Sequence, residues 1–270
     1  MEQTVSNLSD DTAYRISGNG KPVIFLHGFG ESGEVWDLQI KELSKDFRCI
    51  VPDLPGTGLS TGAFAALTEK SLEALAFKVK AIADQEGLNK FTLLGHSMGG
   101  YIALAFAATF PHMLNGFGLI HSSAYADSED KIANRKKSIK FIREQGAPKF
   151  LEQMIPTLYG EKFKAEHQDI IDAHLASALS FDAEVLIAYY EMMISRPHRT
   201  GILSGAQIPV LFIMGTEDKA VNLSDSLAQC YLPAESHIEI LDASGHMGMK
   251  EDPERTTIAM KQFLMHLNEN

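Results

Sequence analysis

The sequence predicts an α/β protein with a mostly parallel central sheet and helices on both of its faces. Short apolar runs of strand length alternate with segments of helix length along most of the chain. Strands that are joined by helical crossovers pair in parallel, and helices then cover both faces of the sheet. The chain has 270 residues, of which 45% are hydrophobic and 22% charged, and is therefore long enough to bury a substantial core.

The predicted strands are mostly apolar runs, as expected for strands buried on both faces. They cover residues 22–28, 48–53, 90–95, 116–122, 208–215 and 237–243. The helices expected between and after them cover 32–43, 67–86, 98–110, 223–232 and 253–267. In the first of these helices, the residues available to the core are Trp36, Leu38, Ile40 and Leu43. Gly87 and Pro111 follow the second and third helices and are typical helix terminators.

The alternation stops between residues 123 and 204. Strand-like runs disappear there, and polar helical patterns cover 128–145, 148–158, 161–178 and 182–196. Parallel α/β sheets bind ligands at the carboxyl ends of their strands, so we expect this insert to form a helical cap over that edge. The predicted organisation is a core in two parts, residues 1–122 and 205–270, interrupted by a cap at 123–204.

The pattern G-x-S-x-G, which surrounds exposed nucleophilic serines, occurs twice. Ser97 in GHSMG follows a predicted strand and precedes a predicted helix, and this setting pushes a serine out at the sheet edge. Ser60 in GLSTG follows a loop of turn residues and lacks the strand. We therefore predict Ser97 as the nucleophile and interpret the second match as accidental. The alternative role for Ser97 is that of a helix N-cap in a glycine-rich turn.

A nucleophilic serine needs a base and an acid that orients the base. In parallel sheets of this kind, the order along the chain is serine, acid, histidine. His246 lies in a glycine-bounded loop after the last predicted strand, at the same sheet edge as Ser97. Asp218 is preferred to Glu217 and Asp242 as the acid, because its short side chain at a loop crest can accept a hydrogen bond from the imidazole. Capping the following helix is the alternative role for Asp218.

An oxyanion hole requires two backbone N–H groups aimed at one point. Met98 follows the predicted nucleophile at a helix N-terminus, where the dipole also favours negative charge. Phe29 stands between two glycines after the first predicted strand and can supply the second donor. We therefore predict the N–H groups of Phe29 and Met98 as the hole. His27, at the end of that strand, is interpreted as a structural histidine that holds the loop.

These motifs together resemble the α/β-hydrolase superfamily, and cap-bearing serine carboxylesterases in particular. The resemblance rests on HGFG at the oxyanion loop, DLPGTGLS after the second strand, GHSMGG at the nucleophile, GTEDKAV at the acid and SGHMGMKEDP at the histidine. It implies the α/β-hydrolase fold with a helical cap inserted after the sixth core strand. It also implies Ser97, Asp218 and His246 as a catalytic triad, with no cofactor and no bound metal.

The resemblance implies a serine hydrolase that cleaves a small or medium acyl ester, thioester or lactone through an acyl-enzyme on Ser97. A serine at this position separates the chain from haloalkane dehalogenases and epoxide hydrolases, which carry aspartate there. The HGFG loop also differs from the HGGG loop of secreted lipases. The alternatives are a C–C bond hydrolase or cofactor-free perhydrolase with the same triad, and a ligand receptor with a vestigial triad.

The net charge and the hydropathy of the chain limit the kinds of partner and the cellular location that we expect. A net charge of −11 argues against nucleic acids and anionic membranes. No apolar run approaches the roughly 18 residues needed to span a bilayer, and the first residues lack a signal-peptide pattern, so we expect a cytoplasmic protein. Two lone cysteines, Cys49 and Cys230, fit a reducing compartment. The expected partner is a small-molecule acyl substrate, and a homodimer is a further candidate assembly.

One segment of the expected cap departs from the acidic average. Residues 131–143 contain six basic side chains, and a solvated helix face is the simpler interpretation. The alternative hypothesis is that this segment docks an acidic carrier or an anionic substrate through Arg135, Lys136 and Lys140. The aromatic and methionine side chains of the expected cap are interpreted as core rather than as pocket, and they include Phe141, Phe150, Met154, Tyr189 and Met192.

Overall fold

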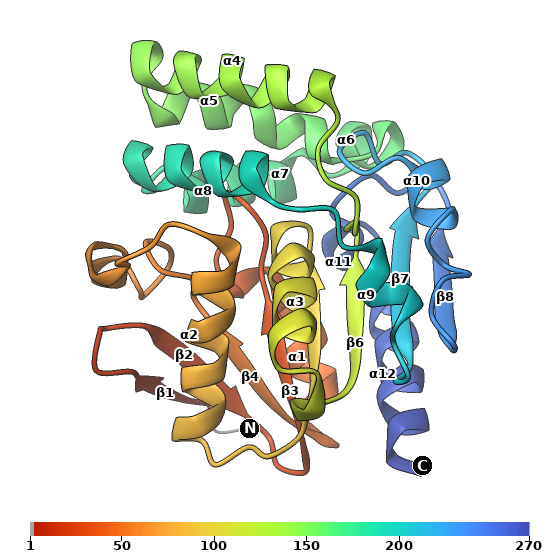
Figure 1. The fold of residues 1–270 in the computed structure, drawn as a ribbon. Coiled ribbons are helices and arrows are strands. Elements are labelled where there is room, and N and C mark those ends of the chain that lie inside the picture. The colour runs from red at the N-terminus through yellow and green to blue at the C-terminus, as the bar shows by residue number, and fades with distance from the viewer. Residues whose placement is uncertain (1–2, 270) are drawn as a thin grey trace.

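A computed structural model describes residues 3–269 of the chain (Figure 1). Its centre is an eight-stranded sheet with the order β1-β2-β4-β3-β5-β6-β7-β8. The strands are β1 (Gln3–Asn7), β2 (Ala13–Ser17), β3 (Lys21–Leu26), β4 (Phe47–Pro52), β5 (Phe91–His96), β6 (Leu114–Ile120), β7 (Val210–Gly215) and β8 (Ser236–Leu241). β2 is antiparallel to both β1 and β4, and all other neighbouring pairs are parallel. The predicted mostly parallel sheet is confirmed.

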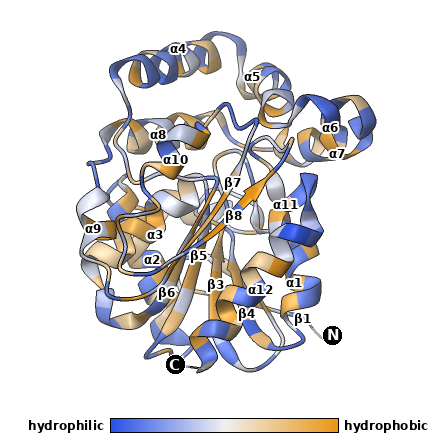
Figure 2. Cartoon of the chain, turned by 90° about the vertical axis from the view of Figure 1, so that its right-hand side faces the viewer, coloured by the Kyte–Doolittle hydropathy of each residue, from blue (hydrophilic) through white to orange (hydrophobic). Residues whose placement is uncertain are grey.

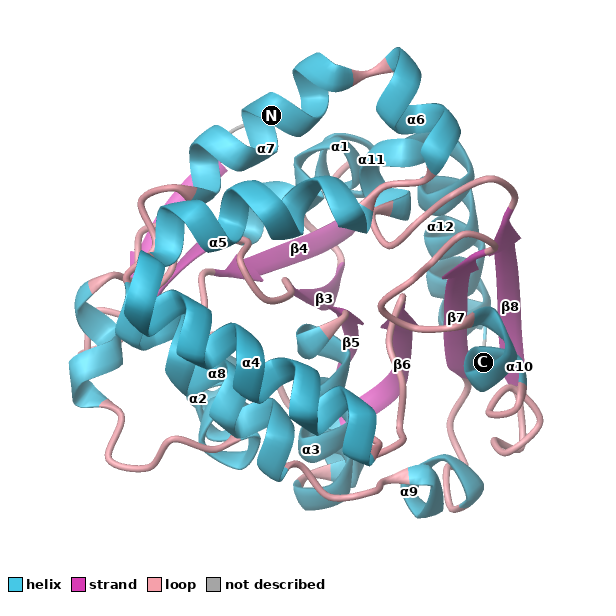
Figure 3. Cartoon of the chain, turned by 90° about the horizontal axis from the view of Figure 1, so that it is seen from above, coloured by secondary structure: helices cyan, strands magenta, loops and turns pink. Residues whose placement is uncertain are grey.

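Helices cover both faces of the sheet, as predicted. On one face lie α1 (Asp37–Leu43), α11 (Gly248–Glu251) and α12 (Pro253–Glu269), which contact one another (Figure 3). On the other face α2 (Leu72–Gln85) packs beside α3 (Met98–Thr109). Two short helices complete this part of the chain, namely α9 (Thr200–Ser204), which contacts α3, and α10 (Leu223–Leu227), which contacts β7.

The remaining helices follow β6, the sixth strand, and lie above the carboxyl ends of the parallel strands (Figure 1). They are α4 (Glu129–Gln145), α5 (Ala147–Met154), α6 (Glu161–Glu166), α7 (Gln168–Ala178) and α8 (Ala183–Ser195). α8 is buried on most of its surface because α4 packs on its outer side. The outer helices α4 and α6 carry many hydrophilic residues, whereas the central strands are largely hydrophobic (Figure 2). This arrangement roofs the edge of the sheet where ligands of parallel α/β proteins bind.

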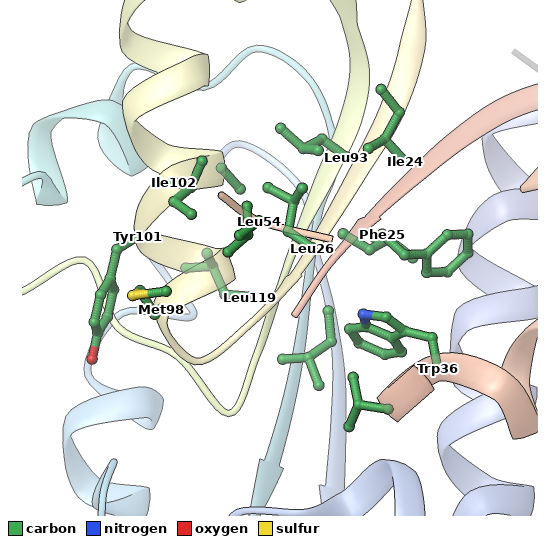
Figure 4. Close-up of a cluster of buried hydrophobic side chains, with 14 of the residues drawn as sticks. Ile24, Phe25, Leu26, Trp36, Leu54, Leu93, Met98, Tyr101, Ile102 and Leu119 are labelled. Atoms are coloured by element: carbon green, nitrogen blue, oxygen red, sulfur yellow. The ribbon is translucent and has the colours of Figure 1, made fainter. Parts of the chain in front are cut away.

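Below the helices α4–α8, buried side chains on both faces of the sheet hold the ends of the central strands in place. Met98 and Ile102 of α3 lie on one side of the central strands, and Phe25 and Trp36 lie on the other (Figure 4). All four side chains are fully buried, and the rings of Phe25 and Trp36 are 5.7 Å apart between centroids. Burial of side chains of this size contributes about 1.5–3 kcal/mol each to folding. The turn after β5 is therefore anchored on both faces of the sheet.

Several predicted elements need correction. The sequence does not predict β1 and β2, because each has only five residues and neither is a continuous apolar run. β1 is a mostly exposed edge strand, and β2, which lies between β1 and β4, mixes polar and apolar residues. Leu38 is 52% exposed instead of buried. Residues 33–36 form a 3₁₀ turn with three residues per turn, which changes the phase of the helix that follows. The expected helix 161–178 is divided at His167, whose backbone is not helical (φ −133°, ψ 46°).

Candidate active site

Ser97 stands in the turn between β5 and α3 with a strained backbone, at φ 50° and ψ −115°. Few non-glycine residues adopt a positive φ, and the strain is held by bonds on both sides of the serine. Its N–H donates to the Ile120 carbonyl at 2.9 Å, and its own carbonyl accepts from Ser122 Oγ at 2.7 Å. The predicted strand–turn–helix setting is present. Ser122 helps to hold the strained backbone of Ser97, and the G-x-S-x-G motif does not include it.

The turn is crowded, which explains the glycines around the serine. A Cβ on Gly95 would lie 2.3 Å from the Gly99 carbonyl carbon, and a Cβ on Gly99 would lie 2.5 Å from the Leu26 carbonyl oxygen. Both contacts are with backbone atoms, which cannot rotate away. A Cβ on Gly28 would lie 3.1 Å from Ser97 Cβ. The loop that carries Phe29 therefore lies directly against Ser97.

The structure brings the predicted acid and base together. His246, in the loop between β8 and α11, donates from Nδ1 to Asp218 Oδ2 over 2.8 Å, and both residues are buried. The other carboxylate oxygen of Asp218 accepts from the N–H groups of Ala220 and Val221, at 2.8 Å each. The rival acids lie elsewhere. Glu217 accepts from the Glu161 N–H, and the Asp242 side chain is 85% exposed.

A second histidine, which the sequence analysis missed, shares the same carboxylate oxygen. His121 follows β6 at φ 47°, is fully buried, and its Nδ1 lies 3.1 Å from Asp218 Oδ2. The motifs give no signal for it, because 97 residues separate His121 from Asp218. The nitrogen and oxygen atoms of His121, Asp218 and His246 lie within 4.8 Å of one another, as metal ligands do. Their separations, however, are hydrogen-bond lengths and account for the cluster directly.

Burial and hydrogen bonding set the charges of this cluster. Burial alone would raise the pKa of Asp218, but its two histidine partners lower that pKa well below the usual value, so the carboxylate is ionised. Burial lowers the pKa of His246, but the charge and hydrogen bond of Asp218 outweigh it, and the net shift is upward. Burial lowers the pKa of His121 to about 4 against the smaller opposing effect of Asp218, so His121 is neutral at pH 7.

Glu31, which directly follows the HGFG motif, and His96 of the GHSMGG motif form a further pair that supports the loops around Ser97. Glu31 Oε2 accepts from the Gly28 N–H at 2.7 Å and lies 2.9 Å from His96 Nδ1. The other ring nitrogen of His96 lies 2.9 Å from the His246 carbonyl. Burial would raise the pKa of Glu31, but His96 lowers it to about 2. This ionised carboxylate therefore ties the Phe29 loop to the loop that carries His246.

Ser97 and His246 both line one cavity of about 360 Å³ beneath the upper helices. Phe29 lines it from the core side, and Met154 of α5 and Tyr190 of α8 line it from above. Of the five side chains that the sequence analysis interpreted as core, four do not line this cavity, and Met154 does. Met98 is fully buried at the first position of α3. The cavity is large enough for a small ligand with a short apolar chain.

Ser60 and His27 have structural surroundings. The Ser60 hydroxyl is fully buried, donates to the Asp53 carbonyl at 2.8 Å and accepts from the Ala13 N–H at 2.8 Å. The Nε2 atom of His27, also fully buried, accepts from the Leu54 N–H at 3.0 Å. Both side chains hold the loop after β4, and neither lines the cavity of Ser97.

The fold and this cluster together define a mostly parallel α/β protein with a strained serine in a strand–turn–helix segment and a buried His–Asp pair. The chain belongs to the alpha/beta hydrolase family, whose model matches residues 23–259. It is similar to a thermophilic esterase from Thermogutta terrifontis, solved with malate bound, with 29% identity, a TM-score of 0.89 and 99% of each chain covered. It is similar to the monoacylglycerol lipase ABHD6 of Bos taurus, with 25% identity over 97% of this chain and 82% of the relative.

A third similarity concerns the fold alone. The enol-lactonase from Burkholderia xenovorans LB400 superposes with a TM-score of 0.85 at 21% identity, covering 97% of this chain and 100% of that one.

Among residues 3–269, no helix combines the length and the apolar character that crossing a membrane requires.

Proposed function

We propose that this protein is a serine hydrolase that cleaves a small or medium acyl ester, thioester or lactone through an acyl-enzyme on Ser97. The observation that carries the proposal is the 2.8 Å hydrogen bond between His246 and Asp218 at a cavity that Ser97 also lines. The similarity to the Thermogutta esterase and to the monoacylglycerol lipase supports an ester as the substrate.

In the proposed reaction, His246 removes the proton of the Ser97 hydroxyl as the oxygen attacks the carbonyl carbon. The Phe29 and Met98 N–H groups stabilise the oxyanion, and one such donor is typically worth about 3 kcal/mol in the transition state. Asp218 keeps His246 oriented and stabilises the imidazolium. His246 then protonates the leaving group, and water repeats the sequence on the acyl-enzyme to release the acid and restore Ser97.

We also infer that residues 123–204 act as a cap that selects the substrate, between the core segments 1–122 and 205–270. This inference is supported by the lining of the cavity, because Met154 and Tyr190 come from helices α5 and α8. A substrate would therefore contact the core at its carbonyl group and the upper helices along its chain.

The test is hydrolysis of p-nitrophenyl acetate and butyrate by the wild-type chain and by Ser97→Ala. We expect measurable turnover by the wild type and a loss of kcat of about a millionfold in the variant, as removal of a nucleophile causes in serine hydrolases. Ser60→Ala is the matched control, because it removes the serine of the other G-x-S-x-G match. Equal rates in the wild type and Ser97→Ala would rule the proposal out.

A further inference from the structure

The cavity that Ser97 and His246 line has a basic side chain in its wall, Arg135 of α4. Its side chain is only 19% exposed. Two other charged side chains in the wall have their own partners. Glu31 is bound by His96 and by a backbone N–H, and Lys219 pairs with Glu161 at 2.7 Å. Arg135 also has an acidic partner, and the number of cations that share this partner sets the net charge that Arg135 brings to the cavity.

Arg135 shares its acidic partner with a second arginine. Asp127, whose side chain is fully buried, lies 2.6 Å from Arg135 Nε and 2.9 Å from Arg196 Nη1. Arginine is charged at every accessible pH, so one carboxylate balances two guanidinium groups and the cluster keeps one positive charge. The excess charge lies in a largely buried environment, where an anion would be attracted more strongly than in water.

The two arginines are not equivalent. Arg196 does not line the cavity, and its Nη1 and Nη2 groups donate to the carbonyls of Met193 at 2.8 Å and Tyr125 at 3.0 Å, respectively. It also lies over the Tyr101 ring at 3.9 Å. Arg135 bonds to Asp127 mainly through Nε and lines the cavity. The excess positive charge is therefore presented to the ligand by Arg135.

The position of Arg135 sets how far from the reacting carbonyl an anion would bind. Its guanidinium carbon lies 5.4 Å from the Tyr190 ring centroid, and that ring stacks on Phe29 at 4.2 Å. The Phe29 N–H is a proposed oxyanion donor. The Tyr190 ring thus lies between the guanidinium and the loop that carries Phe29. A substrate group several atoms from the reacting carbonyl carbon would therefore lie near the guanidinium.

We propose that the substrate is an ester with a second, anionic group, a carboxylate several atoms from the scissile carbonyl, and that Arg135 binds this carboxylate. The inference rests on the proposed serine hydrolase function and specifies its substrate class. A guanidinium matches a carboxylate in geometry as well as in charge, which gives orientation in addition to affinity. The carboxylate could be on the acyl chain or on the leaving alcohol, and these two arrangements require separate substrates.

The experiment compares anionic esters with neutral esters of the same length. Monomethyl adipate and methyl hexanoate test the acyl side, and 3-(butyryloxy)propanoate and propyl butyrate test the alcohol side. Acid release is followed by titration at constant pH in the wild type, Arg135→Gln and Lys140→Gln. Lys140 is the control because it is also basic and on α4 but lines a different surface hollow.

We expect the wild type to prefer the anionic ester of at least one pair. In Arg135→Gln the ratio of kcat/KM for the anionic to the neutral ester should fall by about 10- to 100-fold, as for loss of a hydrogen bond to a charged group. Lys140→Gln should keep the wild-type ratio. Arg135→Gln is expected to fold, because Asp127 keeps Arg196 as its partner. The thermal unfolding midpoint checks this point.

A binding measurement keeps the two proposals separable. Titration calorimetry of monomethyl adipate and of 3-(butyryloxy)propanoate into Ser97→Ala, with and without Arg135→Gln, reports recognition without turnover. Weaker binding of either ligand after Arg135→Gln supports the anion site even if the serine hydrolase proposal fails. If the wild type hydrolyses all four esters with unchanged ratios in Arg135→Gln, and that substitution leaves the binding of both ligands unaffected, the anion site is wrong and the hydrolase proposal stands.

Discussion

Asp218 accepts four hydrogen bonds, two at each carboxylate oxygen, and this makes the role of His121 testable. Removing the His121 donor leaves Asp218 a stronger acceptor for the proton shared with His246. The pKa of His246, already raised, should then rise further. Because the proposed base must be neutral, activity is lost as the pH falls through that pKa. The acid limb of the pH profile should therefore move to higher pH.

We predict this shift for His121→Leu, with a loss of kcat/KM of about tenfold at pH 7, equivalent to about 1.4 kcal/mol, the loss of one hydrogen bond. His121→Asn is the matched variant, since asparagine tolerates the positive φ of 47° and places an N–H near the position of Nδ1. It should stay close to the wild type. Profiles of kcat/KM for p-nitrophenyl butyrate between pH 5 and 9 provide the measurement. Identical shifts in both variants would mean that His121 acts only by packing.

The turn between β5 and α3 depends on backbone contacts that leave no room for a methyl group. In Gly99→Ala the new Cβ would meet the Leu26 and His27 carbonyl oxygens at 2.5 and 2.7 Å. Overpacking of this kind costs about 1–3 kcal/mol of stability. It should also displace the Met98 N–H and lower kcat about 100-fold, the effect typical of a small misplacement at a catalytic centre.

Gly201→Ala is the control for this substitution, because a Cβ at Gly201 meets nothing within 4 Å. It should change the free energy of unfolding by less than about 0.5 kcal/mol. Urea unfolding and kcat for p-nitrophenyl butyrate, measured on both variants, distinguish the two cases. A Gly99→Ala protein with wild-type stability and rate would show that the turn does not require glycine.

The elements that could be predicted from the sequence are those with a local signal. The buried parallel strands and α3 are specified by continuous apolar runs and by glycines next to Ser97, which are local signals. β1 and β2 have no such signal, because β1 is a mostly exposed edge strand and the five-residue strand β2 mixes polar and apolar residues. The split at His167 and the 3₁₀ turn before α1 depend on how each segment packs. Periodicity alone therefore overestimates the length of those helices.

The residues of the candidate site that lie in motifs could be predicted from the sequence. Those that only the fold brings to the site could not. Ser97, Asp218 and His246 lie in short patterns of turn residues after strands. His121 reaches the site from a segment without a motif, and Glu31 directly follows the HGFG motif, whose pattern does not include it. The basic segment 131–143 was visible in the sequence, but only the fold separates Arg135, which lines the cavity, from Lys140, which lines a different surface hollow. The sequence shows which residue types are present, but it does not show which partner or cavity each side chain contacts.

The buried histidines make the stability of the entire domain depend on pH. Burial lowers the pKa of both His121 and His174 to about 4 in the folded chain, against about 6.5 when unfolded. Below pH 6.5 the unfolded chain therefore binds protons that the folded chain excludes, and stability falls by up to about 1.4 kcal/mol per pH unit for each group. His246 has the opposite shift, and its stabilising contribution is present at low pH and lost as pH rises through its raised pKa.

Burial also lowers the pKa of His27, so three lowered histidine pKa values stand against one raised value. The histidines should therefore make the free energy of unfolding decrease between pH 6.5 and 4. We predict that His174→Gln makes this decrease less steep by about 1.4 kcal/mol per pH unit at most, because it removes one excluded proton. Urea unfolding at pH 6.5, 5.5 and 4.5 measures the slope. The exposed His112 provides the control, and His112→Gln should keep the wild-type slope. If His174→Gln and His112→Gln show the same slope, His174 is not held neutral by burial and contributes nothing to the acid sensitivity.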